Sequence, residues 1–326
     1  MVISVLTLLA GLVLVVLGAE WLVDGASNIA RRAGISEFVI GMTIVGFGTS
    51  CPELVVSLTG ALEGNPDVSV GNVLGSNICN TLLILGLTAV IAPVAVTRKN
   101  AGRDIPFTVL VTLLFLCCGL SMSLFGIGGT DNLTRVEGIV LLVLFVAYMI
   151  YCFKSDSGAS SPSSGESEGG PGEKPRGALA AAVLTLLGLG ALVFGGRIFV
   201  DSAVEIAREI GVSQKFIAVT ILAGGTSLPE LATCVVAAAR RKDQLALGNI
   251  LGSNIFNILL ILGCSAVVTP LSLAGLDLVD AAVLALSALM VWMWAFTGRR
   301  NRIDRWEGAL MLALYMGYMV WLFARL

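Results

Sequence analysis

The chain has 326 residues, of which 56% are apolar and 13% charged, with a formal net charge of -2 and a mean hydropathy of +0.93. Soluble proteins carry about 25% charged residues, so the composition excludes an ordinary soluble protein and indicates a polytopic membrane protein. No basic patch suggests a nucleic-acid partner, and the absence of histidine excludes His-ligated zinc and Ser-His-Asp catalysis.

The predicted elements begin with an apolar segment over residues 1–23. It has no Lys or Arg before Arg31, which is unlike a signal peptide and typical of a first transmembrane helix. Nine further segments are apolar and about as long as a hydrocarbon core of about 30 Å requires. They lie at 35–62, 69–92, 105–127, 136–153, 178–200, 213–239, 246–269, 276–297 and 305–325.

Between the fifth and sixth segments, residues 154–177 are rich in Ser, Gly, Pro and Glu. Such a composition cannot bury a core and predicts a flexible linker. The expected fold is therefore all-α, with five helices in residues 1–153 and five in residues 178–326. The seven cysteines all lie in apolar segments. We interpret them as small buried side chains, and expect neither a disulfide framework nor a cofactor.

An internal duplication relates the two halves. The heptapeptide Gly48–Leu54 returns as Gly225–Leu231, and residues 48–86 match residues 225–263 at 20 of 39 positions with a constant offset of 177. The duplicated regions extend over about 38–86 and 215–263. Gly, Asn, Ser, Pro and Glu recur at the same offsets, which chance similarity of apolar segments does not explain.

Five helices per repeat place the second repeat upside down relative to the first, an arrangement that recurs in transporters with a midplane site. If the N-terminus lies outside, the inner loops hold 15 Lys and Arg residues and the outer loops 4, with Arg197 uncounted. The positive-inside rule therefore predicts N-out and C-out, with the linker in the cytoplasm and the chain in the cell (inner) membrane. Because Glu20 and Arg197 are equivalent in the repeats, inversion separates them, and both are expected to reach toward the interfaces.

Each duplicated heptapeptide carries a proline and a glutamate in an apolar run. Pro52 and Pro229 predict a kink or break in each helix. Glu53 and Glu230 are costly in a membrane and predict a functional site. The alternative is a pair of protonated acids that hold helices together. Four-residue spacing also aligns polar side chains in two stripes. These are Asn72, Ser76 and Asn80, and Asn249, Ser253 and Asn257.

The oxygen donors of these four segments indicate the kind of ion. Carboxylates, amides, hydroxyls and freed carbonyls suit calcium, which takes about 6–8 oxygens, or sodium. Soft metals prefer Cys or His, and neither recurs in the duplicated motifs.

The duplicated motifs Gly-Thr-Ser-x-Pro-Glu-Leu and Gly-Asn-x-x-Gly-Ser-Asn-Ile-x-Asn resemble the α-repeats of sodium/calcium exchangers, in the calcium:cation antiporter superfamily. The resemblance implies electrogenic exchange of several sodium ions for one calcium by alternating access, with the first and sixth helices sliding across the other eight. It also implies that Glu53 and Glu230 are the central ligands. The remaining ion contacts implied are Thr49, Thr226, Ser50, Ser227, Ser76, Ser253, Asn80 and Asn257.

Three alternatives remain beside sodium/calcium exchange. Relatives that use potassium often carry Asp where this chain has Asn257, so the resemblance favours the potassium-independent branch and predicts weak proton coupling. Proton/calcium exchangers use a Gly-Asn-x-x-Glu setting, which is absent. A cation channel commonly needs a ring of subunits, whereas a self-contained duplicated site predicts a functional monomer. Nothing in the sequence supports an enzyme.

Overall fold

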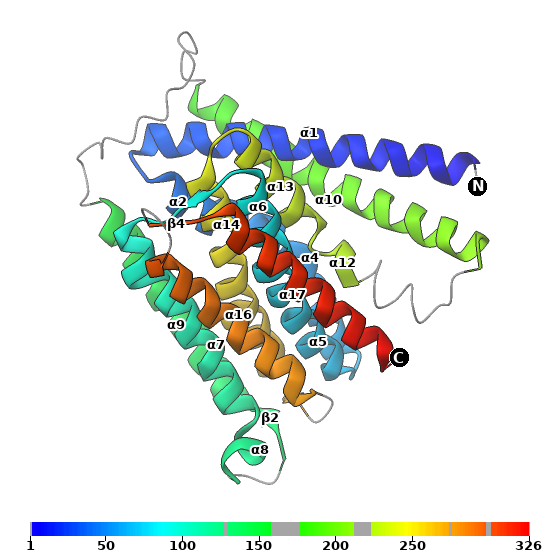
Figure 1. The fold of residues 1–326 in the computed structure, drawn as a ribbon, viewed down its shortest axis with the longest axis vertical. Coiled ribbons are helices and arrows are strands. Elements are labelled where there is room, and N and C mark those ends of the chain that lie inside the picture. Colours follow the sequence, from blue (N-terminus) through cyan, green and yellow to red (C-terminus); the bar gives the residue numbers. More distant parts are fainter. Residues whose placement is uncertain are drawn as a thin grey trace.

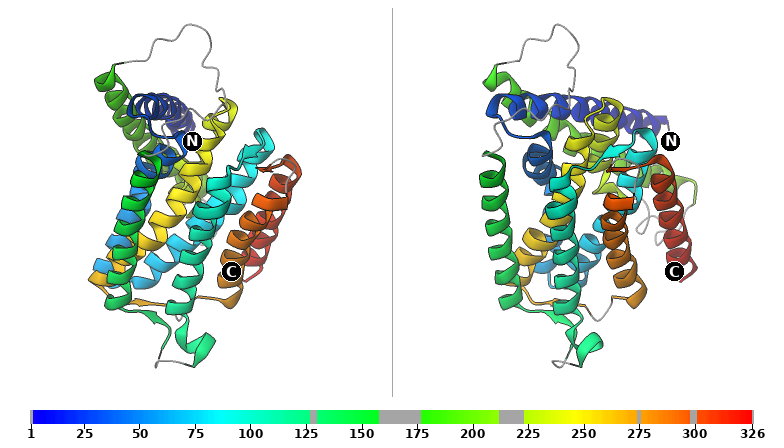
Figure 2. Two further views of the ribbon diagram at one scale, coloured as in Figure 1. Left: turned by 90° about the vertical axis from the view of Figure 1, so that its left-hand side faces the viewer. Right: turned by 60° about the vertical axis from the view of Figure 1, so that its left-hand side comes forward.

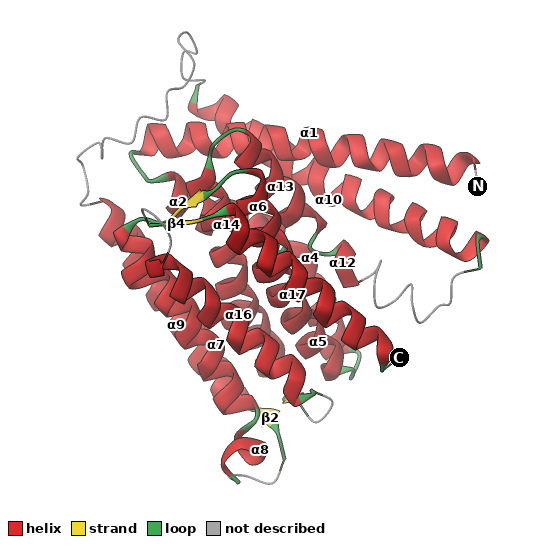
Figure 3. Cartoon of the chain, in the orientation of Figure 1, coloured by secondary structure: helices red, strands yellow, loops and turns green. Residues whose placement is uncertain are grey.

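The computed structural model describes residues 2–126, 130–157, 177–211, 223–273, 276–297 and 301–325. The described chain is almost entirely helical (Figure 3). In the first half the helices are α1 Val2–Ala33, α2 Glu37–Ile40, η1 Gly41–Val45, α3 Gly46–Thr49, α4 Cys51–Leu62, α5 Pro66–Ile78, η2 Cys79–Ile84, α6 Leu85–Ile91, η3 Asn100–Asp104, α7 Ile105–Gly119, α8 Ser121–Phe125 and α9 Arg135–Ser157.

The second half repeats this order. Its helices are α10 Ala178–Glu209, α12 Ala223–Gly225, α13 Leu228–Ala239, α14 Asp243–Ile255, η5 Phe256–Leu262, α15 Gly263–Val268, α16 Leu278–Thr297 and α17 Arg305–Ala324. Adding 177 to the bounds of α4 and α5 gives the bounds of α13 and α14. The offset found in the sequence is therefore also the offset of the helices.

Eight of the described helices are long and apolar enough to cross a membrane, and the bent pair Glu37–Thr49 and Cys51–Leu62 supplies a ninth candidate span. The predicted segment 213–239 falls partly outside the described residues. Its described part is α13, the counterpart of α4. Most of the predicted linker, and the start of the second duplicated region at 215, also lie outside the described residues.

Helices α1 and α10 lie side by side across one end of the bundle, steeply inclined to the other long helices (Figures 1 and 2). Glycine permits this contact. A Cβ at Gly18 would lie 2.7 Å from the backbone nitrogen of Leu192, and one at Gly188 would lie 2.5 Å from that of Leu22. Small residues let membrane helices approach closely, so α1 and α10 form a tightly packed antiparallel pair.

The two repeats are joined by short strands at opposite ends of the bundle. Strand β1 (Val94–Ala95) pairs antiparallel with β4 (Arg302–Ile303), and β2 (Asn132–Leu133) pairs antiparallel with β3 (Leu271–Ser272). Each pairing thus takes one strand from each repeat. We name the two ends after their loops: the α13–α14 side, where Asp243 accepts a hydrogen bond from the backbone of Ala95, and the α4–α5 side.

The helices that carry the polar motifs form the centre. In the most apolar window of the span Pro66–Ile91, 72% of the residues are buried, and in that of Asp243–Val268 the share is 83%. The share is only 17% to 28% in α1, α9, α10 and α17. Apolar side chains such as Leu186 and Phe194 point outward from α10. This distribution places a polar centre inside an apolar shell, as expected for a protein that lipid surrounds.

Candidate ion-binding site

Two broken helices place the central carboxylates. Helix α3 ends at Thr49, α4 begins at Cys51 with Pro52 in its first turn, and the chain bends by 47° at this point. The break predicted from proline is therefore present in the first repeat. Glu53 and Glu230 each lie in the first turn of a helix, α4 and α13, and both are fully buried. The positive end of a helix dipole favours a carboxylate there.

The two carboxylates are held by hydroxyl groups from opposite repeats. Ser50 Oγ donates to Glu230 Oε1 at 3.0 Å, and Ser227 Oγ donates to Glu53 Oε1 at 3.4 Å. Ser253 Oγ adds a weak contact to Glu230 Oε1 at 3.5 Å. The two breaks therefore face each other, and each repeat orients the acid of the other.

Two amide side chains complete the cluster, on wide π-helical turns. Asn80 lies in η2 and donates from Nδ2 to Asn254 Oδ1 at 3.2 Å. Asn257 lies in η5 and donates from Nδ2 to Ser76 Oγ at 3.0 Å and to Asn77 Oδ1 at 2.8 Å. Both amide nitrogens therefore donate hydrogen bonds, and both amide oxygens remain available as acceptors.

Among the buried oxygens that have no hydrogen-bond partner in the described residues, four in this cluster form two repeat-related pairs. They are Glu53 Oε2 with Glu230 Oε2, and Asn80 Oδ1 with Asn257 Oδ1. A buried acceptor without a partner costs about 1–3 kcal/mol, and more when charged. Four such acceptors, two of them on carboxylates, suit a cation. The part of the chain that the structure describes contains no group of three or more His, Cys, Asp or Glu that could hold a metal ion.

The two threonines among the expected ligands behave differently. Thr49 Oγ1 donates to Asn249 Oδ1 at 3.2 Å, so its hydroxyl bridges the two repeats. Thr226 has a buried Oγ1 without a partner among the described residues, and it borders the cavity described below. The structure thus gathers all ten predicted residues into one region, with Thr49 also tied to the opposite repeat.

Asn77 and Asn254 were not among the residues expected at the site, yet they contact it. Asn77 accepts from Asn257, and its own amide nitrogen donates to the carbonyl of Asn254 at 3.2 Å. Asn254 donates in turn to Thr81 Oγ1 at 3.0 Å. Both asparagines recur in the duplicated Gly-Ser-Asn-Ile motif. That recurrence was the signal for a second layer that orients Asn80 and Asn257.

A cavity of about 730 Å³ reaches this cluster from the α4–α5 side. It lies between α4, α5, α10 and α13, and Ser76, Thr226 and Pro229 border its inner part. Gly71 and Gly75 also line it, and no described atom lies within 4 Å of a Cβ built on either. The cavity therefore reaches Ser76 and Thr226 at the edge of the oxygen cluster, whereas Glu53 and Glu230 remain fully buried.

The α13–α14 side is closed at the equivalent place. Gly248 and Gly252 correspond to Gly71 and Gly75. A Cβ at Gly248 would lie 2.2 Å from the carbonyl oxygen of Phe38, and one at Gly252 would lie 2.3 Å from that of Met42. Helix α14 is thus packed directly on the α2–η1 backbone. Among the described residues the cavity lies on the α4–α5 side, which we call the open side, and the α13–α14 side is closed.

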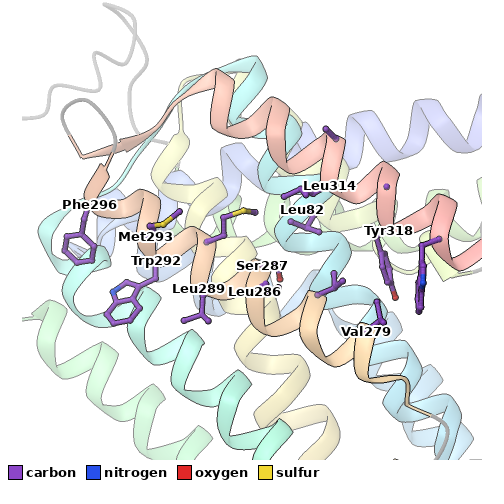
Figure 4. Close-up of a pocket in the computed structure, with 15 residues that line it drawn as sticks. Leu82, Val279, Leu286, Ser287, Leu289, Trp292, Met293, Phe296, Leu314 and Tyr318 are labelled. Atoms are coloured by element: carbon purple, nitrogen blue, oxygen red, sulfur yellow. The ribbon is translucent and has the colours of Figure 1, made fainter.

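A second cavity, of about 1080 Å³, lies between α16 and α17 (Figure 4). Leu286, Trp292, Phe296 and Leu314 line it, and its few polar groups are the hydroxyls of Ser287 and Tyr318 and the indole nitrogens. Among the described residues no carboxylate borders it, so its chemistry suits hydrocarbon and not a cation.

The sequence pattern of sodium/calcium exchanger proteins matches residues 3–154 and 180–324, nearly the whole chain. The chain belongs to the sodium/calcium exchanger family. This is a family of membrane transporters and not of enzymes, which fits the helical fold and the buried oxygen cluster.

Three individual proteins are similar to this chain over nearly its whole length. The chain is 40% identical to the putative antiporter CaxA of Alkalimonas amylolytica, covering 99% of this chain and 100% of that one. It is 36% identical to the inner membrane protein YrbG of Escherichia coli, over 99% and 96% of the two chains. A solved structure of the sodium-calcium exchanger NCX_Mj superposes with a TM-score of 0.83 and 33% identity, covering 98% of each chain. The exchanger fold is therefore shared from end to end.

Proposed function

We propose that this exchanger moves calcium across the cell (inner) membrane in exchange for sodium, by alternating access, with Glu53 and Glu230 as the central ligands. The observation that carries the proposal is the set of four unpartnered oxygens arranged as two repeat-related pairs. Two carboxylates balance the charge of one Ca²⁺, and oxygen donors are what Ca²⁺ and Na⁺ require. The likeness to NCX_Mj supports the same pair of ions.

The arrangement of helices supports the transport cycle. A cavity reaches the edge of the cluster from the α4–α5 side, and backbone packing closes the α13–α14 side. We infer that α1 and α10 slide as one body across the remaining helices to reverse this. Ten spans in two inverted repeats, with both termini outside, complete the proposal. The α4–α5 side is then the outer side, and the linker at 154–177 lies in the cytoplasm.

The decisive measurement is radioactive calcium uptake into proteoliposomes loaded with sodium, potassium or choline at fixed pH. We expect uptake with internal sodium alone, and its loss in Glu53→Gln and Glu230→Gln, because each removes one of the two charges that balance Ca²⁺. Asp67→Asn is the matched control. It removes an exposed carboxylate next to Val68, which lines the cavity, and it should retain uptake.

The other outcomes separate the rival functions. Equal uptake into choline-loaded vesicles would overturn sodium coupling and indicate a channel or another coupling ion. A pH gradient imposed on the same vesicles would then drive uptake if protons are that ion. Uptake that required internal potassium would assign the chain to the potassium-dependent mode.

A further inference from the structure

An ion-pair cluster ties α1 to α13 on the closed side. Arg240 Nη1 lies 2.5 Å from Asp24 Oδ1, and Arg240 Nη2 lies 3.4 Å from Glu20 Oε1. Lys242 Nζ approaches Asp24 Oδ1 at 3.6 Å. These side chains are 20% to 42% exposed. Glu20 therefore does not simply reach toward the interface, as the sequence suggested, but links the α1–α10 pair to the helix that carries Glu230.

The inverted repeat places a second set of charges at the equivalent positions of the α4–α5 side. At the offset of 177, Glu20 corresponds to Arg197 and Arg240 corresponds to Glu63. Both signs of this pair are reversed: the acid is on α1 and the base follows α13, whereas in the equivalent pair the base is on α10 and the acid follows α4. Asp24, the other acid of the cluster, corresponds to Asp201 and keeps its sign. A reversal at both positions preserves attraction, whereas a reversal at one position would create repulsion.

On the open side this second pair is not engaged. Arg197 Nε lies 3.8 Å from Asp201 of its own helix, and the two side chains are 83% and 71% exposed. Both residues line the 730 Å³ cavity that separates α10 from α4 and α5. Glu63, which follows α4, is exposed. The ion pairs between helices are thus formed on the side without the cavity. On the side with the cavity, the equivalent charges do not pair between helices.

We propose that these residues form an alternating ion-pair lock. Arg240 with Glu20 and Asp24 holds the α13–α14 side shut in the state described here. When α1 and α10 slide, this cluster separates and Arg197 pairs with Glu63, which holds the α4–α5 side shut. The proposal rests on the alternating-access function proposed above. In this proposal the charges set the relative populations of the two states and do not bind the transported ions.

The test uses Cys51, a half-buried thiol that lines the open cavity. Its rate of labelling by a membrane-impermeant thiol reagent, read peptide by peptide with mass spectrometry, reports opening of the α4–α5 side without removal of other cysteines. Arg240→Gln should slow labelling about two- to fivefold, the population change that a partly exposed ion pair supplies. Arg241→Gln, the same charge change at the next residue, should match wild type. Arg240→Lys, which retains the charge, should stay near the wild-type rate.

The opposite side gives a reciprocal test. Arg197→Glu should prevent the second pair and leave labelling as fast as, or faster than, in wild type. It should also slow sodium-driven calcium uptake, because the closed α4–α5 side is then destabilised. The double variant Arg197→Glu with Glu63→Arg restores attraction with reversed signs and should recover uptake. Thermal unfolding of each variant shows whether it has folded.

Two results would overturn the lock: equal labelling in Arg240→Gln and Arg241→Gln, or a double variant as slow as Arg197→Glu alone. Failure of the proposed function is distinguishable from both. If wild-type uptake did not depend on sodium but the labelling shifts occurred, the lock would stand and sodium exchange would not.

Discussion

Replacing Gly248 by alanine tests the packing that closes the α13–α14 side. The new methyl group would lie 2.2 Å from the carbonyl oxygen of Phe38 and 2.9 Å from the nitrogen of Met42. Both are backbone atoms, so α2–η1 must move away from α14. Overpacking of this kind costs about 1–3 kcal/mol. The equivalent residue of the first repeat, Gly71, has no described atom within 4 Å of an added Cβ, so Gly71→Ala is a control with the same chemistry.

The two variants share the gain of about 1 kcal/mol that alanine brings to a helix over glycine, so their difference isolates the clash. A difference of about 1–3 kcal/mol corresponds to a change of about 5- to 150-fold in the population of the state described here. We therefore expect Gly248→Ala to label more slowly at Cys51 and to unfold at a lower temperature in detergent, while Gly71→Ala does neither. Equal effects of the two substitutions would refute the reasoning.

Three further predictions concern the site, the α1–α10 contact and the linker. Asn257→Asp adds an acid beside Glu53 and Glu230, and calcium uptake should become dependent on pH or potassium; an unchanged profile across pH and potassium would contradict this role. Gly18→Ala should lower the unfolding temperature by an amount equivalent to about 1–3 kcal/mol, because its Cβ meets Leu192 at 2.7 Å; Gly190→Ala, with no described atom within 4 Å, should not. Deletion of residues 156–174 should leave sodium-driven uptake intact, and its loss in a folded protein would show that the linker is needed.

Much of the fold could be predicted because the duplicated motifs contain residues with narrow structural roles. Pro52 marked the break between α3 and α4, and the constant offset of 177 identified α13 and α14 as counterparts of α4 and α5. The described residues contain eight long apolar helices and one bent pair, and residues 213–222 of the seventh predicted segment lie outside them.

The site was predictable as a set of residues but not as a set of contacts. The resemblance implied that Thr49 contacts the ion together with Glu53, but it gave no hydrogen-bond partner for Thr49. In the structure the helix is broken at Ser50, and Thr49 donates to Asn249 of the other repeat. The wide turns at Asn80 and Asn257 also carry no sequence signature of their own. Contacts between repeats depend on how two distant segments meet, which periodicity does not encode.

Ser50 donates a hydrogen bond to Glu230, and Ser227 donates one to Glu53. These reciprocal bonds between the halves bear on how the sequence of such a protein can evolve. The halves are related as the subunits of an antiparallel homodimer would be, and in a homodimer every substitution appears at both faces. Fusion in one chain removes that constraint. Asn72 donates to Ser57 at 2.9 Å, whereas its counterpart Asn249 donates to the sulfur of Cys234 at 3.3 Å. Each membrane face can therefore be adjusted separately while the shared centre is kept.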